Sequence, residues 1–322
     1  MANANLTNAK RAKNDEFYTQ LTDIEKEMCH YKDFFKGKVV YCNCDDAKGS
    51  NFFKYFSLNF EHLGLKKLIT TGYKADGKGV VLVYEGDKNG NRIVEDSEIV
   101  TKELEGNGDF RSAECIEFLK ECDVVVTNPP FSLFREYVAQ LMEYGKKFLI
   151  IGNQNAITYK EIFPYIKNNE LWLGLSMNGS NRWFQAPDDY EVKENAAGYK
   201  VIDGKKYYFV NGVTWFTNIP HNKRNEELDL YRKYDANAYP KYDNYDAIEV
   251  SKVSEIPMDY EGVMGVPITF LYKYCPSQFE IVGITENADY LKSLYINGCQ
   301  KYDRPYISGK RIYSRLLIKI RA

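Results

Sequence analysis

Histidine and cysteine are too few and too scattered in this chain to form a zinc site. The 322 residues include three His and seven Cys, and only Cys42 and Cys44 lie close together, at a strand-like spacing. Structural zinc sites take four Cys or His ligands, usually as closely spaced pairs. An odd, scattered set of cysteines also gives no disulfide framework, so we expect reduced thiols and no bound metal.

Long hydrophobic runs and an excess of one charge are also missing. No stretch reaches the ~20 apolar residues that cross a bilayer, and residues 1–14 lack the apolar core of a secretory signal, so we expect a cytoplasmic protein. The 43 Lys and Arg nearly balance 45 Asp and Glu. This balance excludes histone-like binding by bulk charge, but it allows a local basic face.

Tyrosine, by contrast, is abundant. The chain has 27 Tyr and 18 Phe, and aromatic residues make up 15% of it. This composition suits amphipathic core filling, and it also suits a surface that stacks on flat ligands. The 44% of hydrophobic and 27% of charged residues are otherwise those of a folded chain of about two domains.

Strand-like and helix-like segments alternate along the first part of the chain. Short β-branched runs predict strands at 38–44, 67–71, 123–128, 147–151 and 172–175. Apolar residues at helical spacing predict helices at 112–122, at 132–144 and after Ser50, where Gly64 is the stop signal. Thr158 and Glu161 have the spacing of a capping box. The alternation predicts an α/β fold with a doubly wound, mainly parallel sheet.

Two Asn-Gly pairs predict hairpins, and a change of composition predicts a domain boundary. Asn89-Gly90 lies between runs 80–84 and 92–94, and Asn211-Gly212 lies between runs 207–210 and 213–217. The alternation ends near Ile219, where the chain becomes rich in Tyr, Pro and Asn. We therefore expect a mobile basic arm at 1–14, a catalytic domain at 15–218 and a smaller region at 219–322.

The sharpest motif is Asn128-Pro129-Pro130-Phe131, at the end of the most apolar predicted strand. Each proline fixes φ and removes a backbone donor, so the turn presents a rigid row of acceptors beside the side-chain carbonyl of Asn128. Two acceptors suit the two N–H groups of a planar amine, and Phe131 would stack on its ring. The alternative is a tight Pro-Pro turn that only ends a strand.

With these residues the chain resembles the S-adenosylmethionine-dependent amino methyltransferases, whose hallmark is Asn, Asp or Ser followed by Pro-Pro and an aromatic residue. Longer blocks are similar to the EcoRI-type adenine-specific DNA methyltransferases: 15–20 (DEFYTQ), 39–46 (VVYCNCDD), 50–56 (SNFFKYF), 108–112 (GDFRS), 123–138 (DVVVTNPPFSLFREYV), 239–250 and 262–271. The resemblance does not extend to residues 73–104, to residues 191–231 or to the last forty residues. It implies a Rossmann-like methyltransferase sheet, a bacterial or phage origin and a target-recognition role for 219–322.

The resemblance also implies a set of residues that bind the cofactor S-adenosylmethionine. The methionine end would be held by Phe17, Tyr18 and Thr19, and by Asn43 and Asp45 after the first strand. That loop has no glycine before Gly49, which departs from the family pattern. The adenine of the cofactor would meet Asp109 and Phe110, and no acidic residue is found for its ribose.

Methylation inside a duplex further implies that the target base is extruded from the stack. Phe184, with Trp215 as runner-up, would clamp that base from the side opposite Phe131, unless both are core residues. Cations interleaved with tyrosines near the C-terminus, and others in the arm, would contact double-stranded DNA; the candidates are Lys310, Arg311, Arg315, Lys10, Arg11 and Lys13. The implied protein is a monomer and the protective half of a restriction–modification pair, although a solitary methylase or a phage-borne one is equally consistent. A GAATTC-like palindrome is the first site to test.

Three other functions use some of the same features. An amino methyltransferase acting on RNA or on a protein glutamine would bind its amine through the same two acceptors. A non-catalytic DNA-binding module could retain the turn as structure alone. Methylation of the cytosine ring needs a nucleophilic Cys, typically after Pro. The one Cys beside a proline, Cys275, precedes Pro276 instead.

Overall fold

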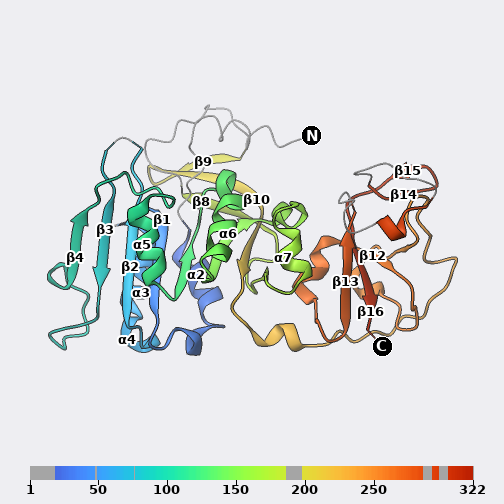
Figure 1. The fold of residues 1–322 in the computed structure, drawn as a ribbon, viewed down its shortest axis with the longest axis horizontal. Helices are drawn as coiled ribbons and strands as arrows, with labels where there is room; N and C mark the ends of the chain where they lie inside the picture. The colour runs from blue at the N-terminus through green and yellow to red at the C-terminus, as the bar shows by residue number, and fades with distance from the viewer. Residues whose placement is uncertain are drawn as a thin grey trace. The chain divides into compact units, whose positions relative to one another are not determined.

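The computed structural model describes residues 19–47, 49–75, 77–185, 198–285, 292–296 and 304–321 (Figure 1). The chain divides into two compact units: residues 1–156 with 173–219, and residues 157–172 with 220–322. Residues 157–172, which the sequence places in the catalytic domain, group with the C-terminal residues. The reason is that helix α7 (Phe163–Lys167) packs against strand β13 (Phe279–Ile284), where Lys167 Nζ donates to the carbonyl of Ile281 over 3.3 Å.

The first unit is built on a ten-stranded sheet with a parallel centre. Four strands lie side by side and parallel, in the order β2 (Lys67–Gly72), β1 (Val39–Asp45), β5 (Val124–Thr127) and β6 (Lys147–Asn153). Antiparallel strands extend both edges: β3 (Val80–Tyr84) and β4 (Ile99–Glu103) beyond β2, and β10 (Lys205–Thr217) beyond β6. Beside β10 lie β7 (Trp172–Leu173), β8 (Ser180–Gln185) and β9 (Tyr199–Ile202).

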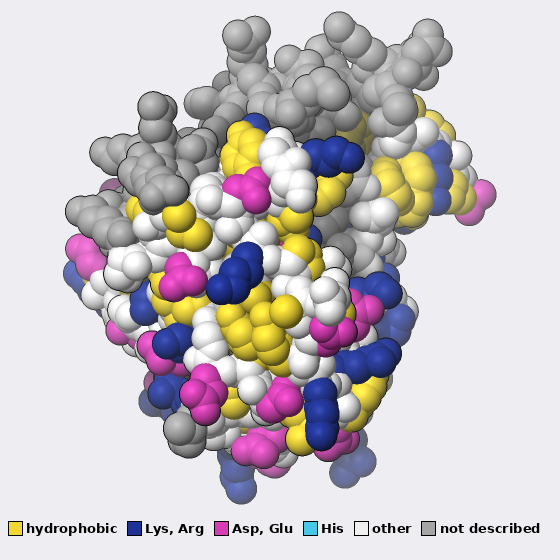
Figure 2. All heavy atoms as spheres, turned by 90° about the vertical axis from the view of Figure 1, so that its right-hand side faces the viewer, with side chains coloured by type: hydrophobic (Ala, Val, Ile, Leu, Met, Phe, Trp, Pro, Cys, Tyr) yellow, Lys and Arg dark blue, Asp and Glu magenta, His cyan; other side chains and the backbone are white. Residues whose placement is uncertain are grey.

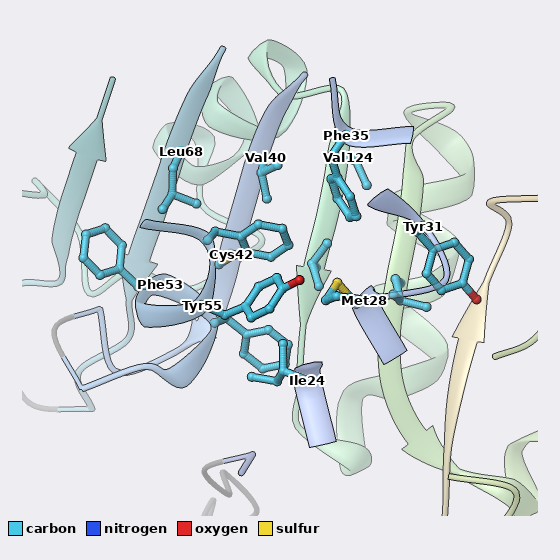
Figure 3. Packing of buried hydrophobic residues seen from close by; sticks show 14 of the residues in the cluster. Ile24, Met28, Tyr31, Phe35, Val40, Cys42, Phe53, Tyr55, Leu68 and Val124 are labelled. Carbon is cyan, nitrogen blue, oxygen red and sulfur yellow. The ribbon is translucent and has the colours of Figure 1, made fainter. Parts of the chain in front are cut away.

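Helices cover both faces of this sheet, because successive side chains of a strand point to opposite faces. Val40 and Cys42 of β1 pack into a buried cluster with α2 (Leu21–Met28) and α3 (Asn51–Leu58), which Figure 3 shows. Between them, Tyr41 meets Phe118 of α5 (Ala113–Glu121), with ring centroids 6.2 Å apart. A third helix, α6 (Phe134–Glu143), packs against β6. The doubly wound α/β fold expected from the sequence is confirmed.

The expected start and end of the helix that follows Ser50 are also confirmed. The Ser50 hydroxyl accepts from the backbone N–H groups of Phe52 and Phe53, over 3.1 and 3.5 Å. Such an N-cap is worth about 1 kcal/mol. The predicted helix divides at Asn59 into α3 and α4 (Phe60–Leu63), and Gly64 ends it with φ of +61°. Ser112 caps α5 in the same way, by accepting from Cys115 N over 3.2 Å.

The first predicted hairpin forms with a different second strand, and the second predicted hairpin does not form. The partner of β3 is 99–103 rather than 92–94, because the Asp87 carboxylate accepts from the backbone N–H groups of Asn89, Gly90 and Arg92 and folds that loop on itself. At Asn211-Gly212 the chain does not turn back. Gly212, with φ of +68°, lies in a bulge within the continuous strand β10, whose two halves pair with different strands. The helix expected from the spacing of Thr158 and Glu161 starts later than predicted: α7 begins at Phe163, and its N-cap residue, Ile162, makes no side-chain cap bond.

The second unit contains a smaller, mostly antiparallel sheet. Its order is β11 (Ile248–Glu249), β12 (Met264–Val266), β16 (Leu316–Ile320) and β13. A separate hairpin pairs β14 (Tyr306–Ile307) with β15 (Lys310–Arg311). Short 3-10 turns connect elements in both units: Lys32–Phe35, Asp96–Glu98, Phe131–Leu133, Gln154–Thr158, Asn222–Asn225, Val253–Glu255, Ile268–Lys273 and Lys292–Leu294. No helix in the described ranges is both long and apolar enough to span a bilayer.

Candidate active site at the carboxyl edge of the parallel sheet

The segment Asn128–Phe131 directly follows β5, which lies between β1 and β6 at the centre of the sheet. Ligands of such sheets bind beyond the carboxyl ends of the strands. The segment is inset rather than exposed, with 4% of Asn128 and 9% of Phe131 accessible to solvent. The carbonyl of Pro130 accepts from Leu133 N over 3.0 Å and so starts the turn that leads into α6. One acceptor of the predicted row is therefore used by the turn itself.

Asn43, near the end of β1, is bonded to two elements of this edge. The Thr127 hydroxyl at the end of β5 donates to its backbone carbonyl, and the Tyr137 hydroxyl of α6 donates to its side-chain Oδ1. Burial raises the pKa of Tyr137 well above its usual range, so the phenol keeps its proton and remains a donor. These bonds hold the ends of β1 and β5 together and orient the Asn43 amide.

The turn after Asn43 explains the missing glycine of the sequence pattern. Cys44 adopts φ of +63°, the left-handed conformation that glycine usually provides. Its pairing with β2 is irregular between Cys42 and Asp45. Cys44 therefore makes the bend without a glycine. The backbone of Asp45 ends β1, whereas its side chain lies outside the described part of the structure.

Loop 106–112 folds over the end of β2 and carries the predicted Asp109 and Phe110. Gly108, with φ of +82°, is packed so closely that a Cβ there would overlap the carbonyl oxygen of Gly72. Arg111 Nε and Nη2 donate to the Asp109 carboxylate over 2.8 and 2.6 Å, and its Nη1 contacts Glu136 at 3.3 Å. These carboxylates raise the pKa of Arg111 further above its usual value. Asp109 is thus a carboxylate oriented by an arginine.

Phe110 and Thr19 are placed against the same edge by their neighbours. The Phe110 ring is buried and meets the Tyr137 ring edge-on, with centroids 4.9 Å apart. Asn51, the first residue of α3, donates its Nδ2 to the carbonyl of Thr19 over 2.7 Å. Thr19 is 1% exposed, and its hydroxyl has no hydrogen-bond partner within the described ranges. Phe17 and Tyr18, predicted with it, lie outside the described residues.

The two candidates for the base clamp, Phe184 and Trp215, are core residues in this structure. They are 1% and 0% exposed and belong to the same buried cluster as Phe131. Trp215 meets Phe52 of α3 edge-on at 6.3 Å. Its indole N–H has no hydrogen-bond partner among the residues that the structure describes. Stacking of Phe184 on an extruded base would therefore require this cluster to open.

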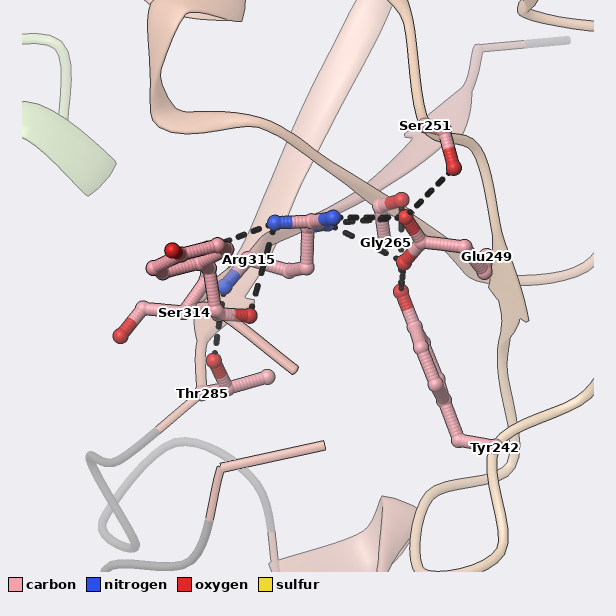
Figure 4. A network of polar contacts seen from close by, with 8 residues as sticks. Tyr242, Glu249, Ser251, Gly265, Thr285, Ser314 and Arg315 are labelled. Atoms are coloured by element: carbon pink, nitrogen blue, oxygen red, sulfur yellow. Dashed lines mark hydrogen bonds and ion pairs between the residues drawn. The ribbon is translucent and has the colours of Figure 1, made fainter. Parts of the chain in front are cut away.

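Arg315 is placed where it does not support the predicted DNA contact. Its side chain is 13% exposed, and its Nε and Nη2 donate to the Glu249 carboxylate over 2.7–3.1 Å (Figure 4). The same carboxylate accepts from Tyr242 and Ser251. Burial and Glu249 raise the pKa of Tyr242, so its hydroxyl stays a donor. The prediction for Arg315 is corrected: its charge is used inside the second unit, because Glu249 is buried beside it.

The other predicted DNA contacts differ in position. Lys310 and Arg311 form β15 and are exposed, and the tip of their hairpin is bound by Asp243, which accepts from Ser308 N and Gly309 N over 3.1 and 2.7 Å. Cations and acids are interspersed among the described residues on the face shown in Figure 2. Lys10, Arg11 and Lys13 lie outside the described residues.

Four residues of this edge were missed by sequence reasoning: Thr127, Tyr137, Arg111 and Glu136. Tyr137 was assigned to the core of a helix by its spacing, and it is buried, but its hydroxyl also reaches Asn43. A basic residue two positions after the predicted Asp109 was the available signal for Arg111. In the described residues, no cluster of three or more His, Cys, Asp or Glu is arranged to hold a metal ion.

Known proteins match this sequence over nearly the whole chain. A family model described as adenine-specific methyltransferase EcoRI matches residues 5–321. The type II methyltransferase M.EcoRI of Escherichia coli is 49% identical over 318 residues, which are 95% of this chain and 97% of that protein. M.MpnI of Mycoplasma pneumoniae is 42% identical over 320 residues, and M.MgeORF184P of Mycoplasma genitalium is 40% identical over 319, each covering 97% of both chains.

Proposed function

The chain belongs to the EcoRI family of adenine-specific methyltransferases, and from this premise we propose that Asn128–Phe131 is its catalytic segment. The reaction is transfer of a methyl group from S-adenosylmethionine to the exocyclic amine of an adenine in duplex DNA. It releases S-adenosylhomocysteine and one proton from the amine. The observation that supports this assignment best is the position of the segment, after the buried strand β5 and beside the bonded end of β1. The type II relatives place the enzyme in the modification half of a restriction–modification system.

The turn would bind the amine through two acceptors. The Pro130 carbonyl is used by Leu133, so the two remaining candidates are the Asn128 side-chain carbonyl and the Pro129 carbonyl. Each accepts one N–H of the adenine amine. Because the nitrogen lone pair of adenine is delocalised into the ring, holding both hydrogens out of the ring plane favours a tetrahedral nitrogen with its lone pair aimed at the methyl donor. Catalysis here is positioning and preorganised electrostatics, without a covalent enzyme intermediate.

The remaining residues of the edge fit S-adenosylmethionine, which supplies an electrophilic methyl group on a sulfonium when bound. Thr19 contributes a buried hydroxyl that has no hydrogen-bond partner in the described part of the chain. Asn43, with Oδ1 taken by Tyr137, presents its amide N–H groups as donors. We assign Asp109, oriented by Arg111, to the adenine amine of the cofactor and Phe110 to its ring. Phe17, Tyr18 and Asp45 complete the proposed set.

DNA is bound by both units in this proposal. Extrusion of the target adenine costs a few kcal/mol, and Phe131 with Phe184 would stack on the extruded base and offset part of that cost. Exposed Lys310 and Arg311 on the β14–β15 hairpin would contact phosphates, as would Lys10, Arg11 and Lys13. The enzyme would act as a monomer without a metal, on the site that a cognate endonuclease cleaves.

Asn128→Ala tests the catalytic assignment, because it removes one of the two acceptors and leaves the fold of the sheet. We expect methyl transfer to fall by at least 100-fold, as for loss of one preorganised group in other active sites. Transfer of labelled methyl from S-adenosylmethionine to duplex DNA, RNA and protein is measured in parallel. Cofactor and DNA affinities are measured by calorimetry and fluorescence anisotropy, and both should remain within about threefold.

Asn59→Ala is the matched control. Asn59 ends α3, where its Nδ2 donates to Tyr55 O over 2.8 Å, away from the segment. Its variant should transfer methyl groups at the wild-type rate. Near-normal methylation of DNA by Asn128→Ala would refute the assignment, and transfer to RNA or protein alone by the wild type would refute the substrate. Sequencing that reports methyladenine in a treated plasmid library identifies the recognition site.

A further inference from the structure

Strand β10 extends well beyond the carboxyl edge on which the proposed catalytic segment lies. Its second half, from Val213 to Thr217, pairs with β6, and Val213 faces Asn153, the last residue of β6. The first half, residues 205–212, therefore continues past the point where β6 ends. At ~3.3 Å per residue this half has a reach of roughly 25 Å. With β8 and β9 it forms a three-stranded extension, called the ribbon below.

The register assigns the side chains of the ribbon to two faces, because residues paired across strands point the same way. Phe184 and Val210 lie on the inner face, where Phe184 is part of the buried cluster and Val210 packs against it. Trp183 pairs with Phe209, and Tyr207 pairs with Lys200, on the other face. Lys205 lies two residues before Tyr207 and shares this outer face.

The outer face combines aromatic rings with ammonium groups. The rings of Trp183 and Phe209 lie 5.0 Å apart. The Lys200 ammonium lies 4.0 Å from the centroid of the Trp183 ring and 5.9 Å from that of Tyr207. This cation–π arrangement holds the Lys200 head group in one place without neutralising its charge. The register leaves Lys200 and Lys205 as the cations of this outer face, because Arg182 and Lys206 lie on the inner face, where Arg182 is paired with Asp23 at 3.6 Å.

Positively charged groups on aromatic rings are the chemistry that recognises a nucleic-acid backbone and its bases. The major groove of DNA, which is ~12 Å wide, admits a two-stranded β-ribbon, and the antiparallel pair of β9 and β10 is such an element. We propose that the outer face of the ribbon binds the duplex next to the extruded adenine, with Lys200 and Lys205 on phosphates and Trp183 against the DNA. This inference rests on the proposed function, since the occupant is the DNA substrate, and it adds a contact in residues 180–185 and 199–212.

The test is the double variant Lys200→Gln/Lys205→Gln, which keeps most of each side-chain stem and removes both charges. Because two phosphates then have no cationic partner on the ribbon, the slope of log affinity against log salt should become shallower by about 1.8. With equal affinities at 1 M salt, binding at 0.1 M salt should weaken roughly 60-fold. Lys88→Gln/Lys102→Gln is the control, because both lysines are exposed at the opposite end of the sheet, near and on β4. The control should match the wild type in slope and affinity.

Tryptophan fluorescence gives an independent measure of proximity. The chain has three tryptophans; Trp215 is buried, and Trp172 lies under Arg224, 3.8 Å from its guanidinium carbon. A duplex without adenine, which provides no base to extrude into the cluster of Trp215, should change the emission of the wild type and of Trp172→Phe, but not that of Trp183→Phe. Cofactor affinity and circular dichroism should be unchanged in every variant.

The outcomes separate this inference from the proposed function. The ribbon contact alone would be overturned if the wild type methylates DNA and the ribbon variants bind DNA with the same affinity, the same salt slope and the same change in emission as the wild type. A wild type that binds the cofactor but methylates no DNA would overturn the proposed function. Loss of salt slope in Lys200→Gln/Lys205→Gln, with loss of the DNA-dependent emission in Trp183→Phe, would support the ribbon as part of the DNA interface.

Discussion

Arg315→Met should destabilise the second unit without removing a phosphate contact. The guanidinium makes three contacts of 2.7–3.1 Å with Glu249, which is 6% exposed, and its Nη1 donates to the carbonyls of Tyr313 and Ser314 over 3.5 and 3.4 Å. After the substitution Glu249 retains only the hydroxyls of Tyr242 and Ser251 from this network, at 2.5 and 3.0 Å.

The magnitude follows from the burial of both partners. Removing one member of a buried ion pair costs about 3–5 kcal/mol, because the other charge is left without compensation. Since whole proteins are stable by only about 5–15 kcal/mol, this is a large fraction of the total. It corresponds to a fall in melting temperature of roughly 6–20 °C for a domain of this size. Replacing both partners, as Arg315→Met/Glu249→Met, should recover most of the loss, since no charge is then buried alone.

Urea unfolding and thermal denaturation of the purified enzyme measure the effect, and DNA binding against salt separates it from a role in recognition. We expect the salt slope of folded Arg315→Met to equal that of the wild type. Lys310→Gln/Arg311→Gln, which alters two exposed cations of β15, should instead give a slope shallower by about 1.8 with unchanged stability. A stability loss under about 1 kcal/mol, or a shallower slope in Arg315→Met, would refute the reasoning and restore the contact expected from the sequence.

Two further predictions concern the first unit. Gly108→Ala should lower the free energy of unfolding by about 1–3 kcal/mol and weaken S-adenosylmethionine binding at least tenfold in calorimetry, because a Cβ at φ of +82° would overlap the Gly72 carbonyl and displace Asp109. Gly106→Ala is the control, because the space around its Cβ is open. Equal cofactor affinities of the two variants would contradict the role of this loop. Brief alkylation at about pH 8, followed by peptide mapping, should modify exposed Cys29 and spare Cys122. Burial raises the pKa of the Cys122 thiol to about 12, so about one molecule in 10⁴ carries the thiolate at this pH. Comparable labelling of the two cysteines would show that Cys122 is accessible.

Short-range sequence patterns and the family resemblance were sufficient to predict the helix ends, the central strand and the family of this protein. Ser50 and Gly64 mark helix ends because capping depends on a few neighbouring backbone groups, and both act as expected. Ser112, the first residue of the predicted helix 112–122, caps α5 in the structure. The β-branched run 124–127 is buried at the centre of the sheet. The blocks around Asn128 identified the EcoRI family, which the family model confirms over residues 5–321.

Pairing between distant segments decided what local patterns could not. Asn211-Gly212 has a hairpin sequence, yet the partners of its flanking runs are β6 on one side and β8 with β9 on the other, so the strand continues through a bulge. The strands available for pairing, rather than the Asn-Gly sequence, decide between a hairpin and a continuous strand here. The partner of β3, 99–103 instead of 92–94, was missed for the same reason, because Asp87 binds the intervening backbone.

The amino-acid sequence by itself determined the fold class, the family and the segment with the acceptors for an amine. Tertiary structure alone decided which charges and hydroxyls are available to a ligand. In the sequence, Arg315 and Lys310 are both cations with nothing to distinguish them. In the fold, Glu249 lies beside Arg315 although it is 66 positions away in the chain, and it pairs with the guanidinium. Tyr137 reaches Asn43 across 94 positions in the same way. Hydrogen bonds and ion pairs act over a few ångströms, so only the folded chain determines which groups meet.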